Sequence, residues 1–152
     1  MKRFTVCTLA LILVSVKTYS QTLPLSFKTQ YVQFSTGNKT GTSETNKPEK
    51  VCSDFLIANG NGLIAKNCTS NKIILSVKFI NSDPTKYESN GSWSKRYFGY
   101  DPQLPSFTPD GTQNLSHVIT IGYDSQVNSY SILIETPNAF KDVSFVWHYF
   151  NL

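Results

Sequence analysis

The chain has 152 residues, 39% of them hydrophobic and 13% aromatic. A chain of this length fits one domain that buries roughly two thirds of its unfolded surface. The net charge is +4. Because no stretch approaches about 18 uninterrupted apolar residues, we expect no membrane span.

The first 20 residues have the pattern of a secretory signal peptide. A basic start at Lys2 and Arg3 precedes an apolar run over Phe4–Val16, and Ser20 ends a small-residue cleavage pattern. We therefore expect residues 1–20 to be removed and residues 21–152 to form a secreted, extracellular domain that begins at Gln21.

Cleavage would also change the charge of the protein. It removes three cations, Lys2, Arg3 and Lys17, and lowers the net charge from +4 to +1. A nearly neutral protein offers little attraction to a polyanion, so we do not expect a nucleic-acid partner.

The secreted part contains two cysteines, Cys52 and Cys68, which we expect to be paired in an oxidising compartment. It also contains four Asn-X-Ser/Thr sequons, which favour a glycoprotein. Their acceptors are Asn38, Asn67, Asn90 and Asn114.

Side-chain alternation with period two dominates the chain and predicts an all-β fold, an antiparallel sandwich of about eight strands or a related barrel. Two connections are long. Ser35–Lys50 has no side chain suited to a core and is expected to be mobile, and Asp101–Gly111 is expected to be irregular but anchored by Leu104 and Phe107. The expected strands are Leu25–Phe34, Val51–Ile57, Leu63–Cys68, Lys72–Asn81, Ser92–Tyr100, Leu115–Tyr123, Asn128–Glu135 and Val143–Phe150.

A hairpin centred on Gly60 would place Cys52 opposite Cys68. The same register pairs Asp54 with Lys66 and Leu56 with Ile64 on one face. At a non-hydrogen-bonded position the two Cα atoms would lie about 4.5 Å apart, which allows a disulfide. Such a bridge is worth roughly 3 kcal/mol of stability.

The segment Ser92–Pro102 is the strongest candidate for a binding site. As a strand it would place Trp93, Lys95 and Tyr97 on one face, and Arg96, Phe98 and Tyr100 on the other. Aromatic rings beside cationic donors are typical of surfaces that bind a protein or a glycan. We assign binding to Trp93, Lys95, Arg96, Tyr97 and Tyr100; in the alternative interpretation the rings only cap the sandwich under the Pro-rich loop.

The last strand carries His148, which alternation places beside Phe150, away from a core row that includes Trp147. We interpret His148 as a half-buried sheet residue. An alternative is a small ribonuclease-like hydrolase in which His117 and His148 act with Glu135 and Arg96. This hydrolase requires the two imidazoles to lie within about 7 Å of each other, or of a Glu, in an open cleft.

The chain has no metal-ligand spacing, phosphate loop or nucleophile elbow, so we expect no metal, no cofactor and no catalytic residue. A signal peptide followed by one small β-rich domain with a disulfide is similar in layout to many secreted interaction proteins, including effectors that pathogens release into hosts. We therefore predict a secreted, N-glycosylated, non-catalytic protein that binds an extracellular protein or a glycan.

Overall fold

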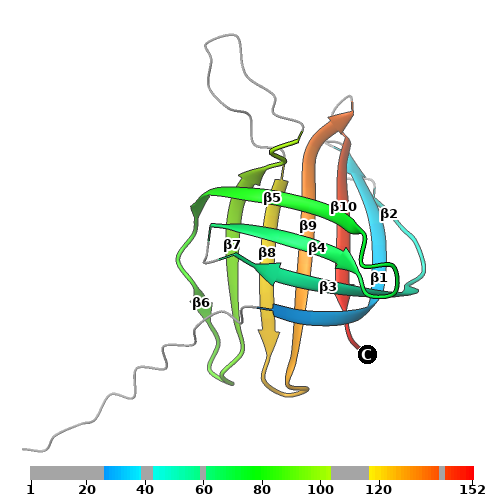
Figure 1. Ribbon diagram of the computed structural model, residues 1–152. Coiled ribbons are helices and arrows are strands. Elements are labelled where there is room, and N and C mark those ends of the chain that lie inside the picture. Colours follow the sequence, from blue (N-terminus) through cyan, green and yellow to red (C-terminus); the bar gives the residue numbers. More distant parts are fainter. Residues whose placement is uncertain (1–25, 39–42, 59–60, 104–116, 141–142) are drawn as a thin grey trace, which may run out of the picture.

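The computed structural model describes residues 26–38, 43–58, 61–103, 117–140 and 143–152, and within these ranges it contains strands and no helix (Figure 1). The segment predicted to be a signal peptide lies outside the described residues. The strands are β1 (Ser26–Asn38), β2 (Ser43–Thr45), β3 (Glu49–Ile57), β4 (Gly62–Asn67), β5 (Ile73–Ser82), β6 (Lys86–Tyr87), β7 (Trp93–Tyr100), β8 (His117–Asp124), β9 (Ser129–Phe140) and β10 (Val143–Phe150).

Eight of these strands form a closed antiparallel barrel in the order β1-β3-β4-β5-β7-β8-β9-β10, and β10 pairs back onto β1. Strands β3–β5 form one layer, which crosses the layer of β7–β10 (Figure 1). β1 joins the two layers because its first half pairs with β3 and its second half with β10. The expected all-β antiparallel fold is confirmed, in its barrel form; β2 and β6 are additional strands on β1 and β7.

The connection from Ser35 to Lys50 is more ordered than we expected. β1 continues to Asn38, β2 pairs with it through Thr36 and Glu44, and β3 already begins at Glu49. Strands form in the described part of this segment because a strand needs only backbone partners, and here β10 and β2 supply them. The anticipated anchors of the second long connection, Leu104 and Phe107, lie outside the described residues.

Inward-facing side chains of the barrel form the core, and each buried aliphatic or aromatic side chain contributes about 1.5–3 kcal/mol. From β10, Trp147 and Tyr149 pack against this core. The alternation expected for Val143–Phe150 is therefore confirmed, with His148 on the outer side. The core residues are Phe27, Phe55, Ile57, Leu63, Ala65, Val77, Trp93, Tyr97, Ile119, Ile121, Ile132 and Ile134.

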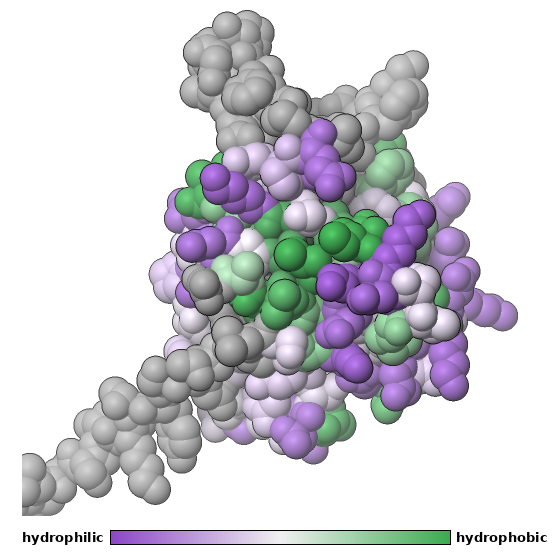
Figure 2. Space-filling model, in the orientation of Figure 1, coloured by the Kyte–Doolittle hydropathy of each residue, from purple (hydrophilic) through white to green (hydrophobic). Residues whose placement is uncertain are grey.

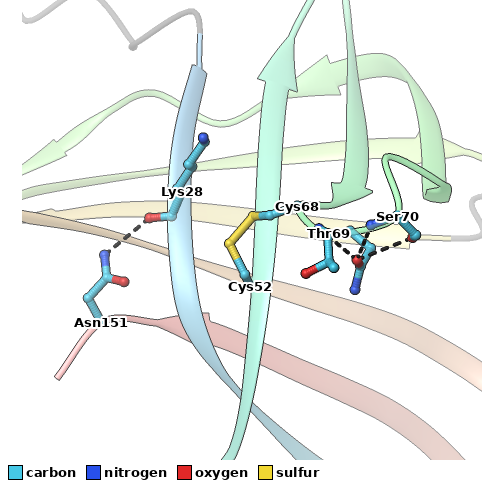
Figure 3. Close-up of a disulfide and its surroundings, with 7 residues drawn as sticks. Lys28, Cys52, Cys68, Thr69, Ser70 and Asn151 are labelled. Atoms are coloured by element: carbon cyan, nitrogen blue, oxygen red, sulfur yellow. Dashed lines mark hydrogen bonds between the residues drawn. A yellow bond between two sulfur atoms is a disulfide. The ribbon is translucent and has the colours of Figure 1, made fainter.

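Cys52 and Cys68 form the expected disulfide beside the β3–β4 hairpin (Figure 3). The predicted register is confirmed, because Asp54 pairs with Lys66 and Leu56 with Ile64. One detail was wrong: the Cα atoms of the two cysteines are 5.4 Å apart, and the Cys68 N–H donates to the Cys52 carbonyl at 3.1 Å. This is the spacing of a hydrogen-bonded antiparallel pair.

Side-chain hydrogen bonds also fix the turn after β4 and the chain just after β10. The Asn67 Oδ1 atom accepts from the backbone N–H groups of Thr69 and Ser70 at 3.0 and 2.9 Å, which holds the turn after β4. Near the C-terminus, the Asn151 side chain donates to the Lys28 carbonyl at 3.1 Å (Figure 3). The hairpin and the closing strand are thus both tied to the barrel wall.

Candidate functional site

The inner face of β7 carries three of the five predicted binding residues. Trp93 and Tyr97 are each only 4% exposed and belong to the core. Lys95 lies between them on the same face, with Nζ 5.3 Å from the centroid of the Tyr97 ring, a cation–π distance. Trp93 therefore presents no ring to the surface.

The other two predicted residues, Arg96 and Tyr100, lie on the outer face of β7. The Arg96 side chain is 52% exposed, and its Nη1 atom is 4.0 Å from Oδ2 of Asp83, a weak surface pair. Tyr100 is half-buried opposite Lys78 of β5. A depression of about 30 Å³ beside Arg96 is lined by Asp83, Pro84, Lys86, Ser94, Arg96 and Thr120.

The two histidines of the alternative hydrolase are not brought together, although His148 has Glu135 as a diagonal neighbour. His117 shares the inner face of β8 with the buried Ile119, whereas His148 lies on the outer face of β10 beside the Phe150 ring, 4.9 Å away between centroids. β9 separates the two strands. Glu135 is on the outer face of β9, diagonal to His148 in the β9–β10 register, and Arg96 is two strands away from Glu135.

Burial in the barrel favours the neutral form of both imidazoles. Burial lowers the pKa of His117, and the nearby Asp101 carboxylate opposes this shift. The His117 Nδ1 atom lies 3.0 Å from the Thr136 hydroxyl oxygen. Burial likewise lowers the pKa of His148. Among the described residues there is no group of three His, Cys, Asp or Glu side chains able to hold a metal ion.

The sequence analysis missed a hydrophobic surface on the outside of the barrel, which we call the outer apolar patch: Leu56, Ile64 and Ile74. Leu56 and Ile74 are 43% and 45% exposed, and Ile64 is half-buried. Leu56 is directly opposite Ile64, and Ile64 is opposite Ser76, which makes Ile74 its diagonal neighbour. Hydrophobic side chains gather in the middle of this side of the molecule, over β4 and its neighbours (Figure 2).

Alternation contained a signal for this patch. With Leu75, Val77 and Phe79 assigned to the core, Ile74 must point outward, on the side where the Leu56–Ile64 pair was expected. Two cations flank the patch: Lys66 follows Ile64 on the same face of β4, and Lys78 is diagonal to Ile64 on β5. Among the described residues, neither lysine forms an ion pair.

Comparisons of the chain with models of known protein families, with curated proteins and with solved structures found no match. In the described part of the chain, no helix has the length and apolar character needed to cross a membrane.

Proposed function

We propose that the chain is a secreted, N-glycosylated protein that acts by binding an extracellular protein partner through the outer apolar patch. The observation that carries the proposal is the exposure of Leu56 and Ile74 beside Ile64 on the solvent side of a barrel whose core is formed separately. Apolar side chains clustered on a surface mark interaction sites more often than scattered ones do. The leader-like first 20 residues and the disulfide support secretion.

The charges around the outer apolar patch favour one kind of partner. Lys66 and Lys78 lie on either side of Ile64 and have no ion pair among the described residues. A partner surface with a hydrophobic centre and Asp or Glu at its edge would bury the patch and pair with both lysines.

The placement of two sequons supports glycosylation. Asn90 is exposed, and its Oδ1 atom accepts from the Ser92 backbone N–H at 2.8 Å. Asn67 uses Oδ1 in the same way to cap its turn. In both residues the Nδ2 atom, which would carry a glycan, has no hydrogen bond within the described residues. Asn38 ends β1, and Asn114 lies outside the described residues.

Partner capture with patch variants tests the proposed function. The variant Leu56→Thr/Ile74→Thr keeps β-branched residues in both strands but removes most of the apolar surface. We expect it to recover at least about tenfold less partner than the wild type from the fluid into which the protein is secreted, measured by quantitative mass spectrometry. Its melting temperature should stay within a few degrees of the wild-type value.

The matched control is Val127→Thr, because Val127 is 67% exposed but lies in the turn between β8 and β9, away from the patch. It should capture the same partner as the wild type. Equal capture by the patch variant and the wild type would refute the proposal. An Arg96→Ala/Tyr100→Ala variant, run beside these, tests whether the outer face of β7 contributes to the same partner.

A further inference from the structure

A pocket of about 260 Å³ is lined by Asn61, which directly precedes β4, and by residues of β5 and β7. It is separate from the outer apolar patch: Ile80 in its wall and Ile74 in the patch are six residues apart on β5, roughly 20 Å along an extended strand. None of its lining side chains is charged. They are Asn61, Phe79, Ile80, Asn81, Ser82 and Tyr97.

A β-bulge in β5 builds one wall of this pocket. The pairing with β7 passes from Phe79↔Gly99 directly to Asn81↔Phe98, so Ile80 has no partner on β7. A bulge of this kind bends the strand and re-aims the residues that follow it, here Asn81. The position of Asn61 is fixed because the Phe79 N–H donates to the Asn61 carbonyl at 2.8 Å, which holds this residue against β5.

Two of the lining residues, Phe79 and Tyr97, carry inner-face rings that stack on each other, and Tyr97 is only 4% exposed. The centroids of Phe79 and Tyr97 are 4.3 Å apart, and their planes differ by 16°. Burial raises the pKa of the Tyr97 phenol, so the hydroxyl keeps its proton at neutral pH and remains a hydrogen-bond donor. Tyr97 is one of the predicted binding residues, and it would contribute to binding from the inner face of β7.

The other polar side chains that line the pocket are neutral hydrogen-bonding groups. The Asn81 Oδ1 atom accepts from the Ser82 backbone N–H at 2.7 Å, which orients the amide and leaves its Nδ2 group available as a donor. Within the described residues, the Asn61 amide and the Ser82 hydroxyl make no side-chain hydrogen bond. The lining side chains therefore offer donors and acceptors together but no charge; the Lys95 ammonium, 5.3 Å from the centroid of the Tyr97 ring, is not part of the lining.

We propose that this pocket binds a single neutral sugar residue, such as a terminal residue of a glycan. A ligand with many hydroxyl groups matches a lining of two amides and two hydroxyl groups, which belong to Asn61, Asn81, Ser82 and Tyr97. The absence of charged lining residues disfavours phosphates, nucleotides and carboxylates, which require cationic partners. The volume is just below the about 300–1,000 Å³ of pockets for drug-sized ligands, which suits one sugar ring.

Titration of the ¹⁵N-labelled secreted chain with glucose, galactose, mannose and N-acetylglucosamine, each followed by NMR, tests the proposal. We expect at least one of these sugars to shift the side-chain amide signals of Asn61 and Asn81, with a dissociation constant in the millimolar range that suits so small a ligand. Asn81→Ala and, separately, Tyr97→Phe should each weaken binding by about fivefold to tenfold.

Gln126→Ala is the matched control, because it removes an exposed amide from the β8–β9 turn, outside the pocket, and it should leave the affinity unchanged. If Asn81→Ala does not fold, Ser82→Ala takes its place. The proposal is overturned if none of the four sugars moves the Asn61 and Asn81 signals, or if the pocket variants bind as tightly as the wild type. Because the patch variant Leu56→Thr/Ile74→Thr leaves the pocket intact, its sugar binding should be normal even if it loses its protein partner.

Discussion

At the scale of single residues, two buried hydroxyl groups stand out in the barrel interior. Thr29 of β1 and Ser53 of β3 are directly opposite each other, and both are fully buried. Neither Thr29 Oγ1 nor Ser53 Oγ has a hydrogen-bond partner among the described residues. A buried hydroxyl without a partner costs about 1–3 kcal/mol, because it loses its bonds to water on folding.

Replacing both hydroxyls by apolar groups of similar shape should therefore stabilise the protein. We expect Thr29→Val/Ser53→Ala to raise the free energy of unfolding by about 1–3 kcal/mol, measured by urea denaturation. The comparison is Ser92→Ala, since the Ser92 hydroxyl accepts from the Ser125 N–H at 3.1 Å and its loss should be destabilising. A less stable Thr29→Val/Ser53→Ala protein would show that the two hydroxyls are satisfied.

At the scale of strands, the contact between β5 and β7 depends on a residue without a side chain. A Cβ atom at Gly99 would lie 2.4 Å from the Lys78 carbonyl oxygen and 2.6 Å from the Val77 Cγ1 atom. The first of these is backbone and cannot turn away. Glycine at this position thus allows the close approach of two strands next to the bulge that forms the pocket.

Gly99→Ala should push β5 and β7 apart and lower the free energy of unfolding by about 2 kcal/mol, as overpacking of a well-packed interior does. Gly37→Ala is the matched control, because a Cβ atom there would meet nothing within 4 Å. Thermal unfolding of both variants provides the measurement. Equal melting temperatures for the two variants would contradict the steric argument.

The sequence predicted individual strands and one hairpin well, because these depend on neighbours along the chain. Alternation placed Trp147 inside and His148 outside, and the turn at Gly60 set the Cys52–Cys68 register. The bulge at Ile80 was not predictable, since it depends on how β5 pairs with β7. The outer apolar patch was missed for a similar reason: Leu56 and Ile74 become neighbours only once β3, β4 and β5 are assembled.

At the scale of the whole molecule, the two imidazoles make global stability depend on pH. The pKa of His117 and that of His148 are both lowered by burial in the folded state. Below the ordinary histidine pKa of about 6.5, the unfolded chain then binds more protons than the folded one. The contribution of these residues to stability is thus present at neutral pH and is lost on acidification.

We expect the free energy of unfolding to fall between pH 7 and pH 5, with a slope of at most about 1.4 kcal/mol per pH unit for each histidine. The double variant His117→Gln/His148→Gln should show a smaller decline over the same range. Denaturant unfolding at a series of pH values would measure both slopes. An identical decline in the two proteins would mean that the histidines do not cause the loss of stability on acidification.

The pairing of Tyr31 in β1 with Phe150 in β10 closes the barrel between two strands at opposite ends of the described chain. During synthesis on the ribosome, β10 is the last of the described strands to emerge, so one edge of β1 has no native neighbour until then. An open strand edge is a template for pairing with other chains. Acquisition of the native state is therefore expected to be largely post-translational, and the cell that makes this protein would need to shield the nascent chain from association until β10 is available.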